Sequence, residues 1–493
     1  MNILKFLIFN LLIIFQCAIE ACSIELENNT DEEIVIDGLK YNYVIRKFKV
    51  PINHFSFVDD RKFEIRYLVN NTWQKEINAP IFFHLGNEGK IEIFAKISGF
   101  LWDIAPIFGA LIIFAEHRYY GESLPFGNKT FSSVKNLEYL NTQQALLDYV
   151  NLIEFLRTDN KLKHSPVIVF GGSYAGQLAA WMRLKYPHIV QGAIAASAPI
   201  LQFSNITDCH LFTRIVTSDF RNTNPICSKA IRQSWDAITN LTSTASGKRW
   251  LFIMWNLCKP LRSKSDVQKL KDWLSNIYIT LAMANYPYPI DFPAPLPAFS
   301  IKHFCKHFTK NDLPHEKLLM ILKKGIDVYA NFTGQNPCID IESGIPELGT
   351  IGWDYQTCTE LVMPICSDGI NDMFEPQSWN LKEIAEYCKK NYKVVPNDQI
   401  ICKQYGCTDF ETATNIVFSN GLMDPWSAGG VLKDLTRSAI AVVIPNAAHG
   451  LDLRGANSAD PHGVIRARDI HRNLIKKWIN DYDELVNQKY ESN

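Results

Sequence analysis

Short apolar runs alternate with helical segments along the first half of the chain, and this alternation limits the available folds more than any other feature. The runs predict buried strands of a parallel sheet, at residues 81–85, 111–115, 167–170 and 194–196. Between them, apolar side chains recur at helical spacing over residues 141–157, and a second helix is predicted over residues 177–186. Strands and helices in alternation predict an α/β fold, with helices on both faces of one sheet.

The alternation stops near residue 200 and resumes near residue 410. The part between has scattered helical periodicity, many aromatic residues and a proline-rich loop at 286–297. Strands are again predicted at 416–418 and 440–444, before a long helix over residues 464–485. We therefore expect one sheet domain made of residues 22–200 and 411–493, interrupted by a mostly helical insertion at residues 201–410.

The N-terminus has the pattern of a signal peptide, because Lys5 precedes an apolar run at 6–15 that is too short to span a bilayer. We assign residues 1–21 to this peptide. No other apolar run is long enough to cross a membrane. The formal net charge of -1 gives no reason to expect nucleic acid or an anionic membrane as a partner.

Cysteines and glycosylation sequons support a secretory protein. Ten cysteines lie beyond residue 200, an even set that predicts disulfides in an oxidising compartment. The chain has no Cys-x-x-Cys pair, so a zinc ribbon is not expected, and nothing else in the sequence indicates a metal or a cofactor. Six Asn-x-Ser/Thr sequons predict surface glycosylation, at Asn28, Asn70, Asn128, Asn205, Asn240 and Asn331.

Residues 171–176 read Gly-Gly-Ser-Tyr-Ala-Gly and lie between a predicted strand and a predicted helix. That is the setting of a nucleophile elbow, a sharp turn that exposes a catalytic serine at the start of a helix. The turn needs small neighbours, which are present at Gly171, Gly172, Ala175 and Gly176. Ser173 is therefore the predicted nucleophile. The alternative is a glycine-rich turn whose serine only caps the helix.

A serine nucleophile needs a general base and an acid that orients this base, and in α/β-hydrolases the chain order is serine, acid, histidine. Asp424 comes just after the strand predicted at 416–418. His449 comes in a loop of small residues after the next strand, so one strand–helix step is expected between acid and base. Asp452 is an alternative acid, whereas His462 is better explained as a capping residue at a helix start.

The tetrahedral intermediate of acyl transfer needs hydrogen-bond donors for its oxyanion. We expect one donor to be the backbone N–H of Tyr174 and the other to come from Gly86 or Asn87, in the loop after the first predicted strand. Glu88 in the same loop places a carboxylate at the mouth of the site. It either binds a substrate amine or positions the loop.

Five stretches spread over nearly the whole mature chain resemble the prolyl carboxypeptidase and dipeptidyl peptidase II family of serine peptidases. These stretches are residues 85–89, 116–123, 171–176, 353–360 and 420–430. The resemblance implies an α/β-hydrolase domain with a helical lid inserted before the acid, the triad Ser173, Asp424 and His449, and no cofactor. It also implies a lysosomal or secreted carboxypeptidase that removes the C-terminal residue after a penultimate proline.

The same resemblance implies four disulfide bonds. The implied pairs are Cys209–Cys366, Cys227–Cys305, Cys258–Cys338 and Cys358–Cys388. Cys402 and Cys407 are left over and could pair across a short loop.

Proline specificity requires a tight apolar pocket, because the proline ring is compact and carries no N–H within a chain. Trp426, two residues after Asp424, and Met363 are the residues we expect to form its wall; core packing is the alternative for both. The chain departs from the family at one place. Relatives carry a second histidine directly after the catalytic one, where this chain has Gly450, and this difference predicts a shifted pH profile.

Other functions stay open on the sequence. A dipeptidyl peptidase would release X-Pro from free N-termini and would use Glu88 to bind the amine. An esterase or lipase of the same fold would need a broad apolar acyl groove, and a non-catalytic binding protein would not need the triad. The expected partners are peptide substrates, and the sequence is compatible with a homodimer.

Overall fold

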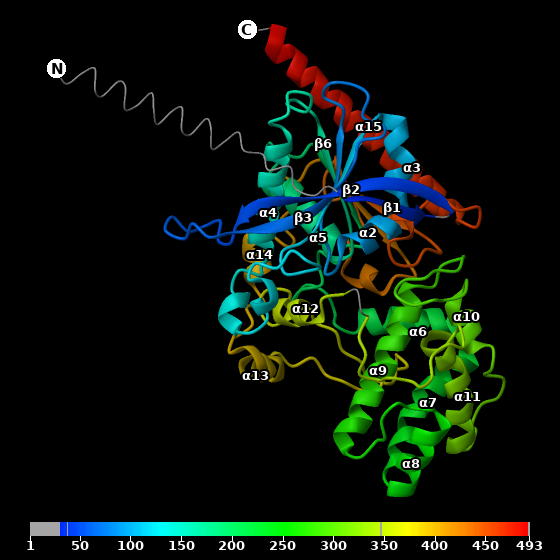
Figure 1. Ribbon diagram of the computed structural model, residues 1–493. Coiled ribbons are helices and arrows are strands. Elements are labelled where there is room, and N and C mark those ends of the chain that lie inside the picture. The colour runs from blue at the N-terminus through cyan, green and yellow to red at the C-terminus, as the bar shows by residue number, and fades with distance from the viewer. Residues whose placement is uncertain (1–29, 37, 346–347, 492–493) are drawn as a thin grey trace.

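One mixed sheet of nine strands forms the centre of the computed structural model, which describes residues 30–36, 38–345 and 348–491 (Figure 1). Along the sheet the strand order is β1-β2-β3-β5-β4-β6-β7-β8-β9. The strands are β1 (Thr30–Ile36), β2 (Leu39–Pro51), β3 (Lys62–Asn70), β4 (Ile81–His84), β5 (Leu111–Ala115), β6 (Val167–Gly172), β7 (Gly192–Ala196), β8 (Ile416–Gly421) and β9 (Ala439–Ile444). The signal peptide assigned to residues 1–21 and the sequon at Asn28 lie outside the described residues.

The predicted apolar runs form the parallel part of this sheet, from β5 through β4 to β9. The antiparallel strands β1, β2 and β3 at one edge were not predicted. Charged side chains interrupt their apolar pattern, and β2 is only partly buried. The elbow follows β6, and the loops with Asp424 and His449 follow β8 and β9. This order confirms the predicted α/β-hydrolase fold.

Helices cover both faces of the sheet because successive side chains of each strand point to opposite faces. Phe82 of β4 packs in the core cluster of α2 (Ile91–Ile97), α3 (Gly99–Phe108) and α15 (His462–Glu491). Its neighbour Phe83 packs on the other face, with α4 (Thr142–Leu156) and α5 (Tyr174–Lys185). The predicted strand–helix step between Asp424 and His449 is wrong in one respect. A short 3₁₀ helix, η3 (Pro425–Gly429), and a loop connect β8 to β9.

The chain between β7 and β8 is helical and divides into two parts in space (Figure 1). One part gathers at the end of the molecule away from the sheet, where it forms a bundle. This bundle contains α6 (Leu211–Thr223), α7 (Pro225–Thr242), α8 (Ala245–Met254), α9 (Lys264–Met283), α10 (Ser300–Cys305) and α11 (His315–Ala330). The other part lies beside the sheet domain and contains α12 (Thr350–Thr357), α13 (Leu381–Tyr392) and α14 (Ile400–Tyr405). In that part Tyr405 stacks on Trp181 of α5, at 4.4 Å between ring centroids.

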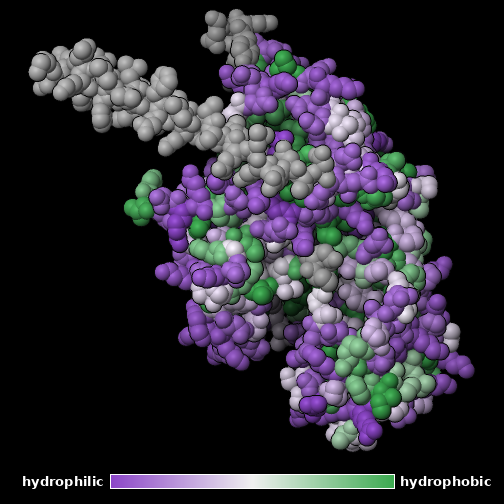
Figure 2. Space-filling view, viewed as in Figure 1, coloured by the Kyte–Doolittle hydropathy of each residue, from purple (hydrophilic) through white to green (hydrophobic). Residues whose placement is uncertain are grey.

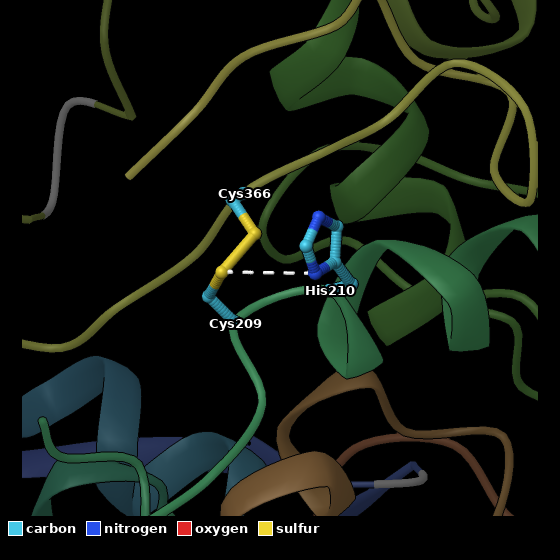
Figure 3. Close-up of side chains that lie close together, drawn as sticks. All are labelled: Cys209, His210 and Cys366. Atoms are coloured by element: carbon cyan, nitrogen blue, oxygen red, sulfur yellow. Dashed lines mark hydrogen bonds between the residues drawn. A yellow bond between two sulfur atoms is a disulfide. The ribbon is translucent and has the colours of Figure 1, made fainter. Parts of the chain in front are cut away.

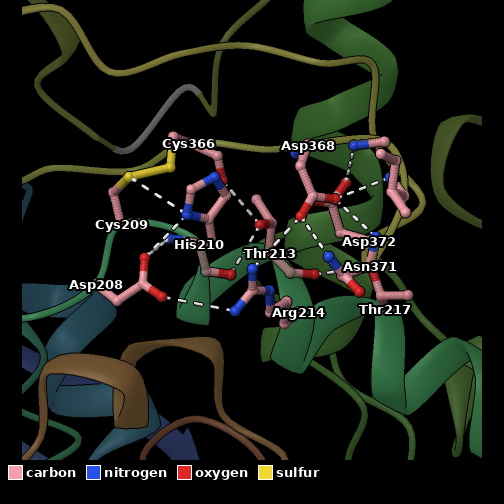
Figure 4. Close-up of polar contacts among 12 residues, drawn as sticks. Asp208, Cys209, His210, Thr213, Arg214, Thr217, Cys366, Asp368, Asn371 and Asp372 are labelled. Carbon is pink, nitrogen blue, oxygen red and sulfur yellow. Dashed lines mark hydrogen bonds and ion pairs between the residues drawn. A yellow bond between two sulfur atoms is a disulfide. The ribbon is translucent and has the colours of Figure 1, made fainter.

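Disulfide bonds reinforce this part of the chain, and all those formed between described residues lie in the insertion. The pairs are Cys209–Cys366, Cys227–Cys305, Cys258–Cys338, Cys358–Cys388 and Cys402–Cys407. Figure 4 shows how the first bond is reinforced by polar contacts between α6 and the loop after Cys366. Thr213 donates to the carbonyl of Cys366 at 2.8 Å, and Arg214 pairs with Asp368 at 3.4 Å.

Among the described residues, no helix has the length and apolar character needed to cross a bilayer. The face in Figure 2 is mostly polar, with an apolar patch on the helical end. The sequons at Asn128, Asn205 and Asn240 are exposed, and Asn331 is partly buried. The expectation of a surface position is wrong for Asn70, because its side chain is buried and donates to the carbonyl of Asn42 at 2.5 Å.

Candidate active site

Ser173 lies in a strained turn between β6 and α5. Its backbone has φ 59° and ψ -126°, a conformation that residues with a side chain rarely adopt. The N–H of Ser173 donates to the carbonyl of Ala196 at 2.9 Å, which holds the turn against β7. Gly171 is required, because a Cβ there would lie 2.0 Å from the carbonyl oxygen of Ala175. At Gly172, by contrast, a Cβ would meet only an ordinary contact at 3.5 Å.

His449 and Asp424 are hydrogen-bonded partners. The Nδ1 of His449 lies 2.9 Å from Oδ2 of Asp424, and the Asp424 side chain is fully buried. The other carboxylate oxygen accepts the N–H of Trp426 at 3.0 Å, which fixes the carboxyl plane. Because an ionised carboxylate only accepts, Nδ1 carries the proton and Nε2 is left with a free lone pair.

The two competing residues have other partners. Asp452 accepts hydrogen bonds from Ser419 at 2.6 Å and from Nε2 of His471 at 2.8 Å. It is therefore engaged with the last helix and not with His449. His462 is the first residue of α15, and it does not line the cavity that contains Ser173.

The loop after β4 braces the elbow. A Cβ at Gly86 would lie 2.4 Å from the backbone nitrogen of His117, so only glycine fits there. The side chain of Asn87 accepts the N–H of Ala175 at 2.6 Å and donates to the carbonyl of Gly172 at 3.3 Å. Asn87 thus spans the elbow on both sides of Ser173. Tyr174 is the first residue of α5, and the backbone N–H groups in the first turn of a helix have no acceptor within that helix.

The Tyr174 side chain is held by a buried polar network that sequence reasoning missed. Its hydroxyl lies 2.9 Å from Nε2 of His117 and accepts from Nε2 of Gln356 at 2.9 Å. Tyr120 donates to the amide oxygen of Gln356 at 2.5 Å. Gln356 belongs to α12, so the insertion positions the residue that follows Ser173. The one sequence signal for this network was the stretch 353–360, which resembles the family. Its contacts with Tyr174 and Tyr120 could not be predicted, because these residues lie far away in the sequence.

Glu88 is half-buried in the cavity that His449 lines, and its Oε2 is buried without a hydrogen-bond partner among the described residues. Burial raises the pKa of the Glu88 carboxyl, while its own backbone N–H and the charge of His449 oppose this increase. The carboxyl therefore holds its proton to a higher pH than an exposed glutamate does. The Oε2 atom of Glu88 remains available to bind a ligand.

Ser173, His449 and Glu88 line one cavity of about 170 Å³. The insertion supplies its opposite wall through the end of α9 and the loop that follows, with Thr280, Met283, Ala284, Tyr286, Phe292 and Pro293. The same segment holds His449 in place. The N–H of His449 donates to the carbonyl of Met283 at 3.1 Å, and the hydroxyl of Tyr286 donates to the carbonyl of His449 at 2.6 Å. The proline-rich loop was predicted, but nothing in the sequence indicated that it faces Ser173.

Met363 and Trp426 do not line this cavity. They line a second hollow, together with Trp353, Trp379 and Tyr387. This hollow lies close to the elbow, because the ring of Trp353 contacts the ring of Tyr174 edge-on, at 5.5 Å between centroids. An aromatic hollow therefore lies near Tyr174, separate from the cavity that Ser173 and His449 line.

One group of side chains has the spacing of metal ligands. The donor atoms of Cys209, His210 and Cys366 lie within 4.8 Å of one another (Figure 3). The two sulfurs are joined in a disulfide, however, and so cannot act as thiolate ligands. His210 instead pairs through Nδ1 with Asp208 at 2.9 Å. This group is structural.

Gly450 has a left-handed backbone with φ 59°, and a Cβ there would have no neighbour within 4 Å. We expect Gly450→His to fold and to change the pH dependence of kcat/KM, because it adds an imidazole of pKa about 6.5 beside His449. The measurement is the pH–rate profile on a peptide substrate. Gly450→Ala is the matched control, since it carries the same backbone cost without a titrating group. An unchanged pH–rate profile for Gly450→His would contradict the prediction.

Residues 50–471 match the serine carboxypeptidase S28 family. The chain is 47% identical over 442 residues to a lysosomal Pro-X carboxypeptidase of Bos taurus, covering 89% of each chain. It is 46% identical over 451 residues to the lysosomal Pro-X carboxypeptidase of Homo sapiens, covering 91% of each. A prolyl carboxy peptidase like protein 5 of Caenorhabditis elegans is 39% identical over 466 residues, with 90% of this chain and 91% of that protein covered. The chain belongs to the serine carboxypeptidase S28 family and is a serine-type peptidase.

Proposed function

We propose that the chain is an exopeptidase that removes the C-terminal residue of peptides after a penultimate proline, with Ser173 as nucleophile, His449 as base and Asp424 as acid. The observation that carries this proposal is the 2.9 Å bond between His449 and Asp424, in a pair whose histidine shares a cavity with Ser173. The family match restricts the chemistry to a serine peptidase.

In the proposed reaction, Nε2 of His449 takes the proton of Ser173 as the serine oxygen attacks the proline carbonyl carbon. Asp424 holds the imidazole in its tautomer and stabilises the imidazolium that forms. The N–H of Tyr174, with a second donor from the Gly86–Asn87 loop, stabilises the oxyanion. His449 then gives its proton to the leaving amine as the carbon–nitrogen bond breaks. Water, activated by the same histidine, releases the proline acid from the acyl-enzyme.

We place the proline of the substrate in the aromatic hollow that contains Met363 and Trp426. An apolar, aromatic wall suits the compact proline ring, and Trp353 connects this hollow to Tyr174 next to the nucleophile. The mammalian relatives are named for a Pro-X specificity, which is consistent with this assignment.

A dipeptidyl peptidase is the second candidate, and one observation favours it. The buried Oε2 of Glu88 has no partner among the described residues and lies in the cavity of Ser173. An ionised Glu88 is suited to bind the free amine of an X-Pro substrate. An esterase of this fold has no comparable support in the site.

We place the enzyme in the secretory pathway, with the lysosome as its destination. The mammalian relatives are lysosomal by name, and five disulfides require an oxidising compartment during folding. Glycans are proposed at Asn128, Asn205, Asn240 and Asn331. The homodimer stays a prediction.

Two assays test the proposed function. A fluorophosphonate probe should label the parent enzyme and not Ser173→Ala, which shows whether Ser173 is the nucleophile. An N-terminally blocked peptide that ends in Pro-Phe should release free phenylalanine. Cleavage of only a free-amine X-Pro amide would establish the dipeptidyl peptidase instead. Turnover of esters alone would establish an esterase.

A further inference from the structure

The cavity beside His449 contains a cation with no acidic partner. Of the described residues around it, Arg454 is the one permanently charged basic side chain. No carboxylate of the described chain forms a salt bridge with Arg454. The nearby acids are engaged elsewhere, since Asp452 bonds Ser419 and His471, and Asp460 pairs with Arg468 at 2.5 Å. A half-buried, unpaired guanidinium in a cavity is suited to bind an anion.

Arg454 is held in a defined place relative to the catalytic histidine. Its guanidinium carbon lies 4.3 Å from the centroid of the Tyr286 ring, a cation–π contact that restrains the long side chain. Tyr286 is itself anchored, because its hydroxyl donates to the carbonyl of His449. Gly450 lines the same cavity and has no side chain to occupy the space.

The chemistry of the proposed reaction places an anion in this region. When a carboxypeptidase acts, the leaving group is a single amino acid, and its carboxylate carbon is about 2.5 Å from the nitrogen that leaves. His449 protonates that nitrogen, so the carboxylate must lie close to the His449 side chain, separated from it by no more than the length of one substrate residue. A dipeptidyl peptidase has no such carboxylate, because its leaving group is the rest of the peptide.

We propose that Arg454 binds the C-terminal carboxylate of the substrate and thereby selects carboxypeptidase over dipeptidyl peptidase cleavage. This assignment rests on the proposed function. The planar guanidinium matches a carboxylate and can donate two hydrogen bonds to it, and Tyr286 supports it from one face. Glu88 lines the same cavity, and because burial raises the pKa of its carboxyl, it opposes this ligand less in acid than an exposed glutamate would.

The test compares Arg454→Met with the parent enzyme on two blocked peptides, one that ends in Pro-Phe with a free carboxylate and one that ends in Pro-Phe-amide. We expect kcat/KM on the free acid to fall about 10- to 100-fold, mainly through KM, and kcat/KM on the amide to stay unchanged. Arg454→Lys should recover part of the loss. Arg472→Met removes a partly exposed arginine that pairs with Asp469 on α15, and it should change neither substrate.

An equal loss on both peptides would overturn the assignment and give Arg454 a role in positioning Tyr286 and His449. No loss on either peptide would overturn it as well. Failure of the proposed function is a separate result: the parent enzyme itself would leave both Pro-Phe peptides intact and cleave X-Pro amides. Inhibition by free phenylalanine adds a readout of binding alone. It should weaken in Arg454→Met and remain in Arg472→Met.

Discussion

Replacing Asp424 with asparagine is expected to lower kcat about ten-thousand-fold while the fold is retained. Asparagine keeps the oxygen that accepts the N–H of Trp426, so the loop geometry has no reason to change. Its amide nitrogen, however, donates to Nδ1 of His449 and forces the proton onto Nε2. That tautomer cannot take the proton of Ser173. Steady-state kinetics on a blocked peptide ending in Pro-Phe measures the loss.

Asp452→Asn is the matched control for this result, because Asp452 is the other buried acid close to His449 in sequence. It is bonded to Ser419 and His471, so its replacement should leave kcat near the parent value. The free energy of unfolding should instead fall by about 1–3 kcal/mol, as charged hydrogen bonds are weakened. If Asp452→Asn lost activity as severely as Asp424→Asn, the assignment of the acid would be wrong.

Replacing Arg118 with methionine is expected to lower the free energy of unfolding by about 3–5 kcal/mol. Arg118 is fully buried and donates to both oxygens of Asp148, at 2.7 Å each. It also donates to the backbone carbonyls of Pro51, Ile52 and Tyr139, and so ties the strand β2 to α4 and the segment before it. Methionine fills much of the volume but leaves a buried carboxylate without its main partner. Chemical denaturation followed by tryptophan fluorescence measures the change.

Arg61→Met provides the comparison for this prediction. Arg61 also pairs with an aspartate, Asp59, at 2.7 Å, but its side chain is 52% exposed. Solvent screens such a pair, so its loss should cost less than about 1 kcal/mol. Combining Arg118→Met with Asp148→Asn should recover part of the stability, because both charges are then removed. Equal destabilisation by Arg61→Met and Arg118→Met would contradict the argument.

The parallel strands and the elbow could be predicted because their signals are local. Buried strands such as β6 read as short apolar runs, and the turn at Ser173 requires small residues within three positions. The antiparallel strands β1–β3 escaped prediction because charged residues interrupt the apolar runs in their sequences. Charged residues interrupt the apolar pattern of β2, and its pairing with β1 on one side and β3 on the other makes it a strand.

The candidate site residues also fall into those that the sequence could predict and those that needed the structure. The triad order placed Ser173, Asp424 and His449 at the ends of three strands, but the choice between Asp424 and Asp452 needed the distance to His449. Met363 and Trp426 were expected at the proline wall, yet the structure puts them in a hollow separate from the Ser173 cavity. Asn70 has a valid sequon, but the side chain is buried against β2.

By itself, then, the sequence determined the α/β-hydrolase scaffold and predicted the nucleophile and the chain order of its partners, since the apolar runs, the elbow motif and the strand ends are local signals. Only the tertiary structure decided which distant segments enclose the site. It brought Tyr286 and the end of α9 onto His449, Gln356 onto Tyr174, and Arg454 into the cavity without an acidic partner. The physical reason is that burial and pairing of polar groups depend on segments that lie far apart in the sequence.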